Sequence, residues 1–229
     1  MGLKSAYLAL YNASLCAGWA YVLYLSVVAY QSGGARVVYQ AVEMPLKVVQ
    51  TTAILEVVHA AVGLVRSPVF VTAQQVASRI AVLWGVLHSV PSVATRTLGF
   101  TVAGTLVGVN VFTLMLAWCS SEIIRYGFFA FKEAGMSPYV LLWLRYTGFI
   151  ILYPIGVSSE LGLTYMALPA IKATGMYNYY MPNALNFAFD YHAFLIVGML
   201  AYIPGFPQLY FYMLGQRKKQ LGSSKSKTA

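Results

Sequence analysis

Charged residues are scarce in this 229-residue chain, where they make up 9% of the sequence. A soluble domain usually carries roughly a quarter. Acidic residues are the scarcest, because six Asp and Glu stand against 15 Lys and Arg and leave a formal net charge of +9. The basic residues lie in short connections and at the C-terminus rather than on one continuous polar face, which argues against a nucleic-acid partner. With 59% hydrophobic residues and a mean hydropathy of +0.68, the sequence predicts an integral membrane protein.

Cysteine and histidine are also rare. Cys16 and Cys119 lie inside apolar stretches and provide neither a disulfide framework nor a metal-ligand spacing. The clustered histidine boxes of desaturases and condensing enzymes are absent, because the three histidines are far apart in the sequence: His59, His88 and His192. The chain also lacks the Gly-x-Gly-x-x-Gly phosphate loop of many nicotinamide-dependent reductases. We therefore expect no metal and no cofactor.

Long apolar runs, in contrast, are abundant. A helix needs about 20 residues to cross the hydrocarbon core. Six segments satisfy this length: residues 6–30, 45–65, 74–93, 97–118, 139–159 and 190–214. The first is too long for a signal-peptide core and lacks a clear cleavage site, so it is predicted to remain as a span. Arg79 and His88 interrupt the third, while Gly104 and Gly108 give the fourth a small-xxx-small spacing that permits close helix contact.

Six spans place both termini on one side of the membrane. Nine basic residues fall on that side: Lys4, Arg66, Arg125, Lys132, Arg217, Lys218, Lys219, Lys225 and Lys227. Four fall on the opposite side: Arg36, Lys47, Arg96 and Lys172. Because positive residues are enriched on the cytosolic side, we expect an all-α, six-helix transmembrane bundle with cytosolic N- and C-termini. The bundle is predicted to occupy residues 1–214, with a basic cytosolic tail at 215–229 and a tyrosine-rich lumenal loop at 161–189 that lies along the membrane interface.

Ionisable side chains at membrane depth are energetically costly, so each is a functional candidate. Six occur in or beside the predicted spans: Glu56, His59, Arg79, His88, Arg145 and Glu160. The alternative is that they pair with each other and only fix helix packing, for example Glu56 with Arg79. The neighbourhood of Glu160 favours a functional role for that residue.

Glu160 follows Tyr153 by seven residues, which is two helical turns. Both side chains therefore share one helix face, and a kink at Pro154 can reduce the rise of about 10 Å between them. Gly156 removes a side chain from the same region. A carboxyl and a phenol on one face suit elimination of water, in which one group removes a proton beside a thioester carbonyl and the other protonates the leaving hydroxyl. We assign Glu160 as base and Tyr153 as acid, and leave the reverse assignment open.

The run Leu144-Arg145-Tyr146, followed by Tyr153-Pro154-x-Gly156-x-x-x-Glu160, resembles the 3-hydroxyacyl-CoA dehydratases of very-long-chain fatty acid elongation, also called the protein-tyrosine-phosphatase-like or PTPLA family. Further matches lie at residues 7–11, 44–51, 55–59, 120–126, 181–183 and 213–217, and plant members look most similar. The resemblance implies a lyase of the endoplasmic reticulum membrane that converts (3R)-3-hydroxyacyl-CoA to trans-2-enoyl-CoA, with Tyr153 and Glu160 as the catalytic pair. It also implies that four matching residues support the site: Glu56, Arg79, Arg145 and Gly156.

A member of this family is expected to bind an acyl-CoA and membrane lipid. It would work beside the other elongation enzymes, which are a condensing enzyme, a ketoacyl reductase and an enoyl reductase. Because coenzyme A phosphates cannot enter hydrocarbon, the catalytic face must open to the cytosol. Arg125, Lys132 and Arg145 are candidates for phosphate or pantetheine contacts at that mouth, the alternative being simple helix-end charges. Glu160 falls near the far end of the predicted fifth span, which places the thioester deep for a straight helix.

Other functions can be weighed on the same residues. A phosphatase needs His-Cys-x5-Arg, but this chain reads His59-Ala60 before Arg66, so the thiolate nucleophile is missing. Cys119 and Arg125 have the spacing but lack the glycines that let backbone amides cradle a phosphate. Loss of the catalytic pair would favour a non-catalytic scaffold of the elongation complex or a phosphotyrosine-binding regulator, and broken helices in paired halves would favour a transporter. Neither feature occurs in the sequence.

The C-terminus carries one possible targeting signal. Lys225 and Lys227 lie five and three places from the end of the chain, counting the last residue. This spacing resembles a cytosolic dilysine signal for retrieval to the endoplasmic reticulum. The alternative is a solvated basic tail.

Overall fold

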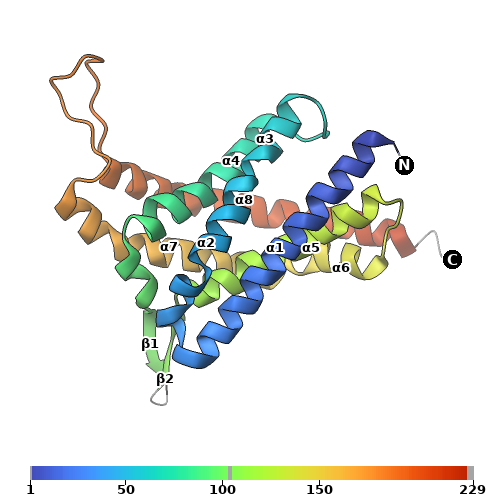
Figure 1. The fold of residues 1–229 in the computed structure, drawn as a ribbon, viewed down its shortest axis with the longest axis horizontal. Helices are drawn as coiled ribbons and strands as arrows, with labels where there is room; N and C mark the ends of the chain where they lie inside the picture. The colour runs from blue at the N-terminus through green and yellow to red at the C-terminus, as the bar shows by residue number, and fades with distance from the viewer. Residues whose placement is uncertain (1, 103–104, 226–229) are drawn as a thin grey trace.

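Helices account for most of the chain (Figure 1). The structure is a computed structural model that describes residues 2–102 and 105–225. The α-helices are α1 Leu3–Gly33, α2 Ala35–Thr52, α3 Ile54–Ala61, α4 Val69–Ile80, α5 Val111–Glu133, α6 Tyr139–Thr147, α7 Phe149–Thr174 and α8 Tyr191–Lys225. A π-helical segment η1 (Ala81–His88) continues α4, and a short 3₁₀ helix η2 (Pro91–Thr95) precedes a hairpin of β1 (Leu98–Val102) and β2 (Thr105–Val109).

Four helical segments among the described residues are long and apolar enough to cross a membrane. They are Leu3–Gly33, Val69–His88, Phe149–Thr174 and Tyr191–Leu221. The start of α1 and the end of α8 lie at the same end of the molecule (Figure 1). Large apolar side chains on α8 are exposed: Phe194, Ile196, Val197, Leu200, Ile203 and Phe211. A soluble monomer rarely exposes so large an apolar surface, and the predicted membrane class is supported.

The first predicted span agrees with α1, but the second begins earlier than expected. The prediction started at residue 45. Pro45 instead lies inside α2, which starts at Ala35. Charges at Arg36, Glu43 and Lys47 concealed this part of the helix. The Lys47 ammonium lies 2.6 Å from the Glu43 carboxylate one turn away, so two of these charges compensate each other.

The third predicted span corresponds to α4 and η1, shifted toward the N-terminus by a few residues. The helix accommodates Arg79 because the guanidinium pairs with Glu122 of α5. Gly85 lies in η1, and a Cβ there would overlap the hydroxyl of Tyr191 at the start of α8. This close approach joins α8 to η1.

The fourth predicted span, residues 97–118, is wrong in its first half. Residues 98–102 and 105–109 pair as antiparallel strands, and α5 begins only at Val111. The Asn110 side chain accepts hydrogen bonds from the backbone N–H groups of Phe112 and Thr113, which fixes the helix start. Gly108 lies in β2 opposite Gly99, where the two backbones approach closely, so its predicted helix contact is wrong, while Gly104 lies outside the described residues. α5 continues beyond the predicted end at residue 118 to Glu133.

The fifth predicted span, residues 139–159, is two helices in the structure. α6 and α7 meet at Gly148, whose N–H still donates to the Leu144 carbonyl at 2.7 Å. α7 then continues to Thr174 and ends at Gly175, which adopts the left-handed conformation favoured by glycine. The predicted loop at 161–189 is therefore wrong in its first half, which is helical. The remaining residues project away from the helices (Figure 1).

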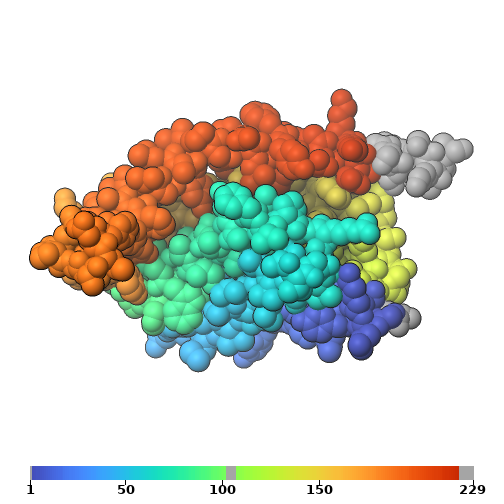
Figure 2. Space-filling view, turned by 90° about the horizontal axis from the view of Figure 1, so that it is seen from above, coloured from blue at the N-terminus to red at the C-terminus, as the bar shows by residue number. Residues whose placement is uncertain are grey.

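The sixth predicted span, residues 190–214, corresponds to α8, which runs on without a break to Lys225. Part of the predicted tail is therefore helical. α8 packs mainly against α6 and α7, whereas the best-packed pairs are α1 with α5 and α1 with α2. Figure 2 places α8 along one edge of the molecule and α1 at the opposite edge. The core between them includes Trp19, Leu46, Leu83, Leu114 and Trp118.

Candidate active site

Glu160 lies buried at the junction of three helices. It belongs to α7 and is 9% exposed. The indole Nε1 of Trp118, on α5, donates a hydrogen bond of 2.7 Å to Glu160 Oε1. The hydroxyl of Tyr202, on α8, donates one of 2.8 Å to Glu160 Oε2. Each carboxylate oxygen therefore has a donor from a different neighbouring helix.

Tyr153 lies two turns before Glu160 on the same helix. Its ring stacks on Phe206 of α8, with centroids 5.0 Å apart and ring planes at 2° to each other. Tyr153 is close enough to interact electrostatically with Glu160 and with Tyr202. Within the described part of the chain its hydroxyl has no hydrogen-bond partner, so the phenol is free to meet a bound molecule.

α7 packs closely on α5 between these two residues. Gly156 is buried there, and a Cβ added to it would lie 3.5 Å from the Ala117 Cβ, which is an ordinary contact. Ser159 bonds to Thr113 of α5 at 2.8 Å between the two hydroxyl oxygens. Gly156 lies on the face shared by Tyr153 and Glu160, and its missing side chain leaves space between them.

A network of four charged residues lies beside the carboxylate site. Arg125 of α5 bridges two carboxylates: Nη1 and Nη2 lie 2.7 and 2.8 Å from the Glu56 oxygens, and Nε lies 2.8 Å from Glu122 Oε2. Arg79 pairs with the other oxygen of Glu122, and the Tyr126 hydroxyl donates to Glu56. The example pair suggested by the sequence, Glu56 with Arg79, is therefore wrong, because each residue pairs with a partner on α5.

The network reaches the Glu160 carboxylate through an aromatic ring. The Arg79 guanidinium carbon lies 5.5 Å from the centroid of the Trp118 ring, within the range of a cation–π interaction. Trp118 in turn donates to Glu160. Arg79 and Glu56, two of the residues expected to support the site, are thus connected to Glu160 without touching it.

The other predicted residues lie apart from this junction. Arg145 of α6 packs on the rings of Phe128 and Phe129, at 4.8 and 4.5 Å from their centroids. Its Nη1 is buried and has no hydrogen-bond partner. Lys132 is exposed in the last turn of α5. His59, a further candidate, bonds to the Tyr7 hydroxyl at 2.9 Å.

His88 belongs to a separate polar group. Its Nδ1 lies 2.9 Å from the Lys47 ammonium and 3.6 Å from Glu43. His59 and His88 therefore contact groups other than Glu160. Among the described residues, no group of three or more His, Cys, Asp and Glu side chains could hold a metal ion.

Sequence reasoning missed Trp118, Glu122 and Tyr202 as members of the site. Glu122 could have been found, because it stands three residues before Arg125 and such pairs meet on a helix. Tyr202 carries a weaker signal, since a tyrosine in a membrane helix needs a partner for its hydroxyl. Nothing in the local sequence of Trp118 indicates its partner, which is 42 positions away.

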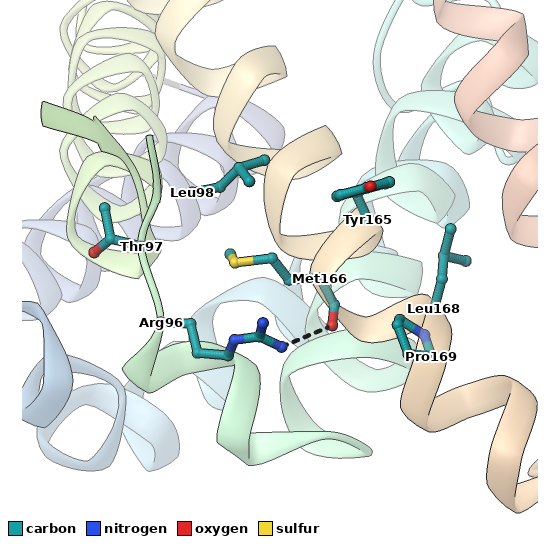
Figure 3. Close-up of a pocket in the computed structure, with 7 residues that line it drawn as sticks. All are labelled: Arg96, Thr97, Leu98, Tyr165, Met166, Leu168 and Pro169. Atoms are coloured by element: carbon teal, nitrogen blue, oxygen red, sulfur yellow. Dashed lines mark hydrogen bonds between the residues drawn. The ribbon is translucent and has the colours of Figure 1, made fainter. Parts of the chain in front are cut away.

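A separate pocket of about 340 Å³ lies beyond Glu160 along α7 (Figure 3). Its lining residues are Arg96, Thr97, Leu98, Tyr165, Met166, Leu168 and Pro169. The Arg96 guanidinium points toward the Met166 carbonyl, with Nη1 at 3.4 Å. Neither Tyr153 nor Glu160 lines this pocket, so it is distinct from the site at the helix junction.

Comparison with known proteins identifies the class. The family model for protein tyrosine phosphatase-like protein, PTPLA, matches residues 50–223, and the chain belongs to this family. The resemblance inferred from the sequence is confirmed. No solved structure matches.

Curated relatives cover almost the whole chain. The chain is 48% identical over 223 residues to very-long-chain (3R)-3-hydroxyacyl-CoA dehydratase PASTICCINO 2 of Arabidopsis thaliana, covering 97% of this chain and 96% of that protein. It is 46% identical over 224 residues to PASTICCINO 2B of Oryza sativa subsp. japonica, with the same coverage. The human very-long-chain (3R)-3-hydroxyacyl-CoA dehydratase 2 is 44% identical over 220 residues, which are 96% of this chain and 82% of the human protein.

Proposed function

We propose that this chain is a hydro-lyase that dehydrates (3R)-3-hydroxyacyl-CoA to trans-2-enoyl-CoA in very-long-chain fatty acid elongation. The observation that carries the proposal is the buried Glu160, held by two uncharged donors beside the unpartnered hydroxyl of Tyr153. The names of the relatives support the same reaction. A scaffold has no need of a buried carboxylate without a cationic partner, since isolated charges are costly to bury.

The proposed reaction uses the two groups in complementary roles. Glu160 removes a proton from C2 of the acyl chain, whose acidity comes from the adjacent thioester carbonyl. The electrons of the C2–H bond form the C2=C3 double bond, and the C3–O bond breaks. Tyr153 gives its proton to the departing hydroxyl, which leaves as water. The proton on Glu160 then returns to the Tyr153 phenolate and restores the starting state.

Two variants test this assignment in purified protein with a defined 3-hydroxyacyl-CoA. Tyr153→Phe and Glu160→Gln should each lower turnover by at least about 100-fold, the usual scale for a positioned acid or base. Tyr210→Phe on α8 and Glu133→Gln at the end of α5 serve as matched controls. Near-normal turnover in both catalytic variants would favour the scaffold or phosphotyrosine-binding alternative.

The membrane arrangement is part of the proposal. We place six spans in the endoplasmic reticulum membrane, adding α2 with α3 and α5 to the four long apolar segments, and the termini in the cytosol. The common end of α1 and α8 (Figure 1) and the excess of basic residues at that end support this arrangement. Lys225 ends α8, and Lys227 of the suggested retrieval signal lies outside the described residues. Partners in this membrane would be the condensing enzyme, the ketoacyl reductase and the enoyl reductase.

The coenzyme A head group is proposed to remain in cytosolic water. Of the three basic residues considered for its mouth, Arg125 is already engaged by two carboxylates. Lys132 is exposed and remains available to phosphate or pantetheine oxygens, whereas the unpartnered guanidinium nitrogen of Arg145 is buried.

A further inference from the structure

We propose that Trp118 and Tyr202 are positioning residues that hold the Glu160 carboxylate in its reactive orientation. This inference rests on the proposed role of Glu160 as the base. The two donors come from α5 and α8, on different sides of α7, and each engages a different oxygen, at 2.7 and 2.8 Å. With both oxygens held, rotation of the carboxylate about its terminal bond breaks at least one hydrogen bond.

The two donors are themselves held in place. Trp118 is 2% exposed, and the Arg79 guanidinium lies over its ring. Tyr202 belongs to α8, which is attached to the bundle by a stack of Phe206 on Tyr153 one turn further along. Aromatic side chains have few rotatable bonds, so little conformational freedom remains at either contact. The orientation of Glu160 is thus set by two packed aromatic donors rather than by long, flexible polar side chains.

The donors differ in what they allow when Glu160 takes up a proton. An indole nitrogen can only donate, so its hydrogen bond to Oε1 is strongest while the carboxylate is ionised. A phenol can donate or accept, so Tyr202 can turn its hydroxyl and accept a hydrogen bond from a protonated Oε2. We therefore assign Oε2 as the oxygen that receives the C2 proton and Trp118 as the donor that keeps Oε1 unprotonated.

The test measures kcat, KM and thermal unfolding of Trp118→Phe and Tyr202→Phe in detergent with a defined 3-hydroxyacyl-CoA. Tyr202→Phe keeps the ring and removes only the hydroxyl donor. Trp118→Phe keeps an aromatic side chain and removes the indole N–H donor. We expect kcat to fall at least about 10-fold, as for other donors that orient or stabilise reacting groups, with KM changed less than about twofold. A carboxylate that is present but misoriented reacts slowly without binding substrate less well.

Matched controls separate positioning from packing. Tyr210→Phe removes a hydroxyl from the same helix, and Trp19→Phe removes a buried indole N–H that has no partner. Neither should change kcat. A normal kcat in Trp118→Phe and Tyr202→Phe overturns the inference, and so does a fall in kcat that is matched by a lower unfolding temperature or by the controls. If Glu160→Gln itself retains turnover, the proposed function fails instead.

Discussion

At the scale of single residues, three carboxylates of the bundle, two of them buried and Glu56 partly buried, differ in their partners. Glu56 and Glu122 face arginines, which balance their charge. Glu160 receives only uncharged donors in the described structure. An arginine balances the charge of the carboxylate with which it pairs, whereas neutral donors leave the charge of a carboxylate unbalanced. This contrast, invisible in the sequence, supports the proposal that Glu160 is the reacting carboxylate and that the other two are structural.

Gly156 provides a residue-scale prediction. An added Cβ makes only an ordinary contact with Ala117, but it occupies the helix face between Tyr153 and Glu160. Gly156→Ala should therefore leave the unfolding temperature in detergent unchanged while turnover falls about 10-fold through misplacement of substrate. Gly162→Ala on the same helix is the contrasting variant, because its Cβ would lie 2.5 Å from a methyl of Val109 and should lower the unfolding temperature. Full turnover in Gly156→Ala contradicts the prediction.

At the scale of helices and strands, the length of an apolar run predicted long, regular helices well. It failed where the run contains residues that favour a strand. α1 follows from its long run of apolar residues. Residues 98–109 are equally apolar, but β-branched side chains and the facing Gly99 and Gly108 suit a hairpin with closely approaching backbones. A periodicity argument cannot distinguish these cases, because a short apolar run fits a strand or a helix equally well.

The Arg125 network yields the prediction at this scale. Arg125→Leu leaves Glu56 and Glu122 facing each other with only Arg79 to balance them. Removing one partner of a fully buried ion pair typically costs about 3–5 kcal/mol. Because the Arg125 and Glu56 side chains are 33% and 18% exposed, the cost here should be smaller, but the variant should still unfold at a lower temperature in detergent. Lys132→Leu, two turns further along α5 and exposed, should unfold normally. An Arg125→Leu protein as stable as the parent would show that water reaches and screens these carboxylates.

At the scale of the whole molecule, the sequence predicted the class and the family but not the junction around Glu160, and the assignment of Tyr153 and Glu160 as the catalytic pair stays a prediction. Tyr153 and Glu160 could be proposed as a pair from the sequence because both lie on one helix with a fixed spacing. Trp118 and Tyr202 join them only through the packing of α5 and α8 on α7, which depends on contacts between residues 42 positions apart in each case. Such long-range pairs leave no periodic signal in one sequence.

The length of α7 changes where Glu160 lies within its helix. The predicted fifth span ended at residue 159, which put Glu160 at the far end of the membrane helix. Because α7 continues to Thr174, Glu160 lies well inside the helix and nearer to its middle. The path from the end where Lys132 lies is unchanged, because the extension of α7 lies beyond Glu160, so the thioester still has to reach deep into the bundle from that end.

The end from which coenzyme A enters can be identified with two lysines. Lys132 lies in the last turn of α5 and Lys172 in the last turn of α7, and both are exposed. These helices run in opposite directions, so the two charges mark opposite ends of the bundle (Figure 1). If coenzyme A enters at the end shared with the termini, Lys132→Glu should raise KM for acyl-CoA about threefold, as expected for one exposed charge, and Lys172→Glu should leave KM unchanged.

A second substrate decides what Lys132 contacts. An acyl-pantetheine lacks the nucleotide phosphates, so it should show little change in KM with Lys132→Glu if the ammonium meets those phosphates. An equal rise for both substrates would mean that the substitution disturbs the fold near α6 rather than a phosphate contact. A rise confined to Lys172→Glu would place the entrance at the opposite end, beside the hairpin, and would reverse the proposed orientation of the site. The rise in KM caused by Lys132→Glu should also become smaller at high ionic strength, because salt screens exposed charges over about 10 Å at 0.1 M.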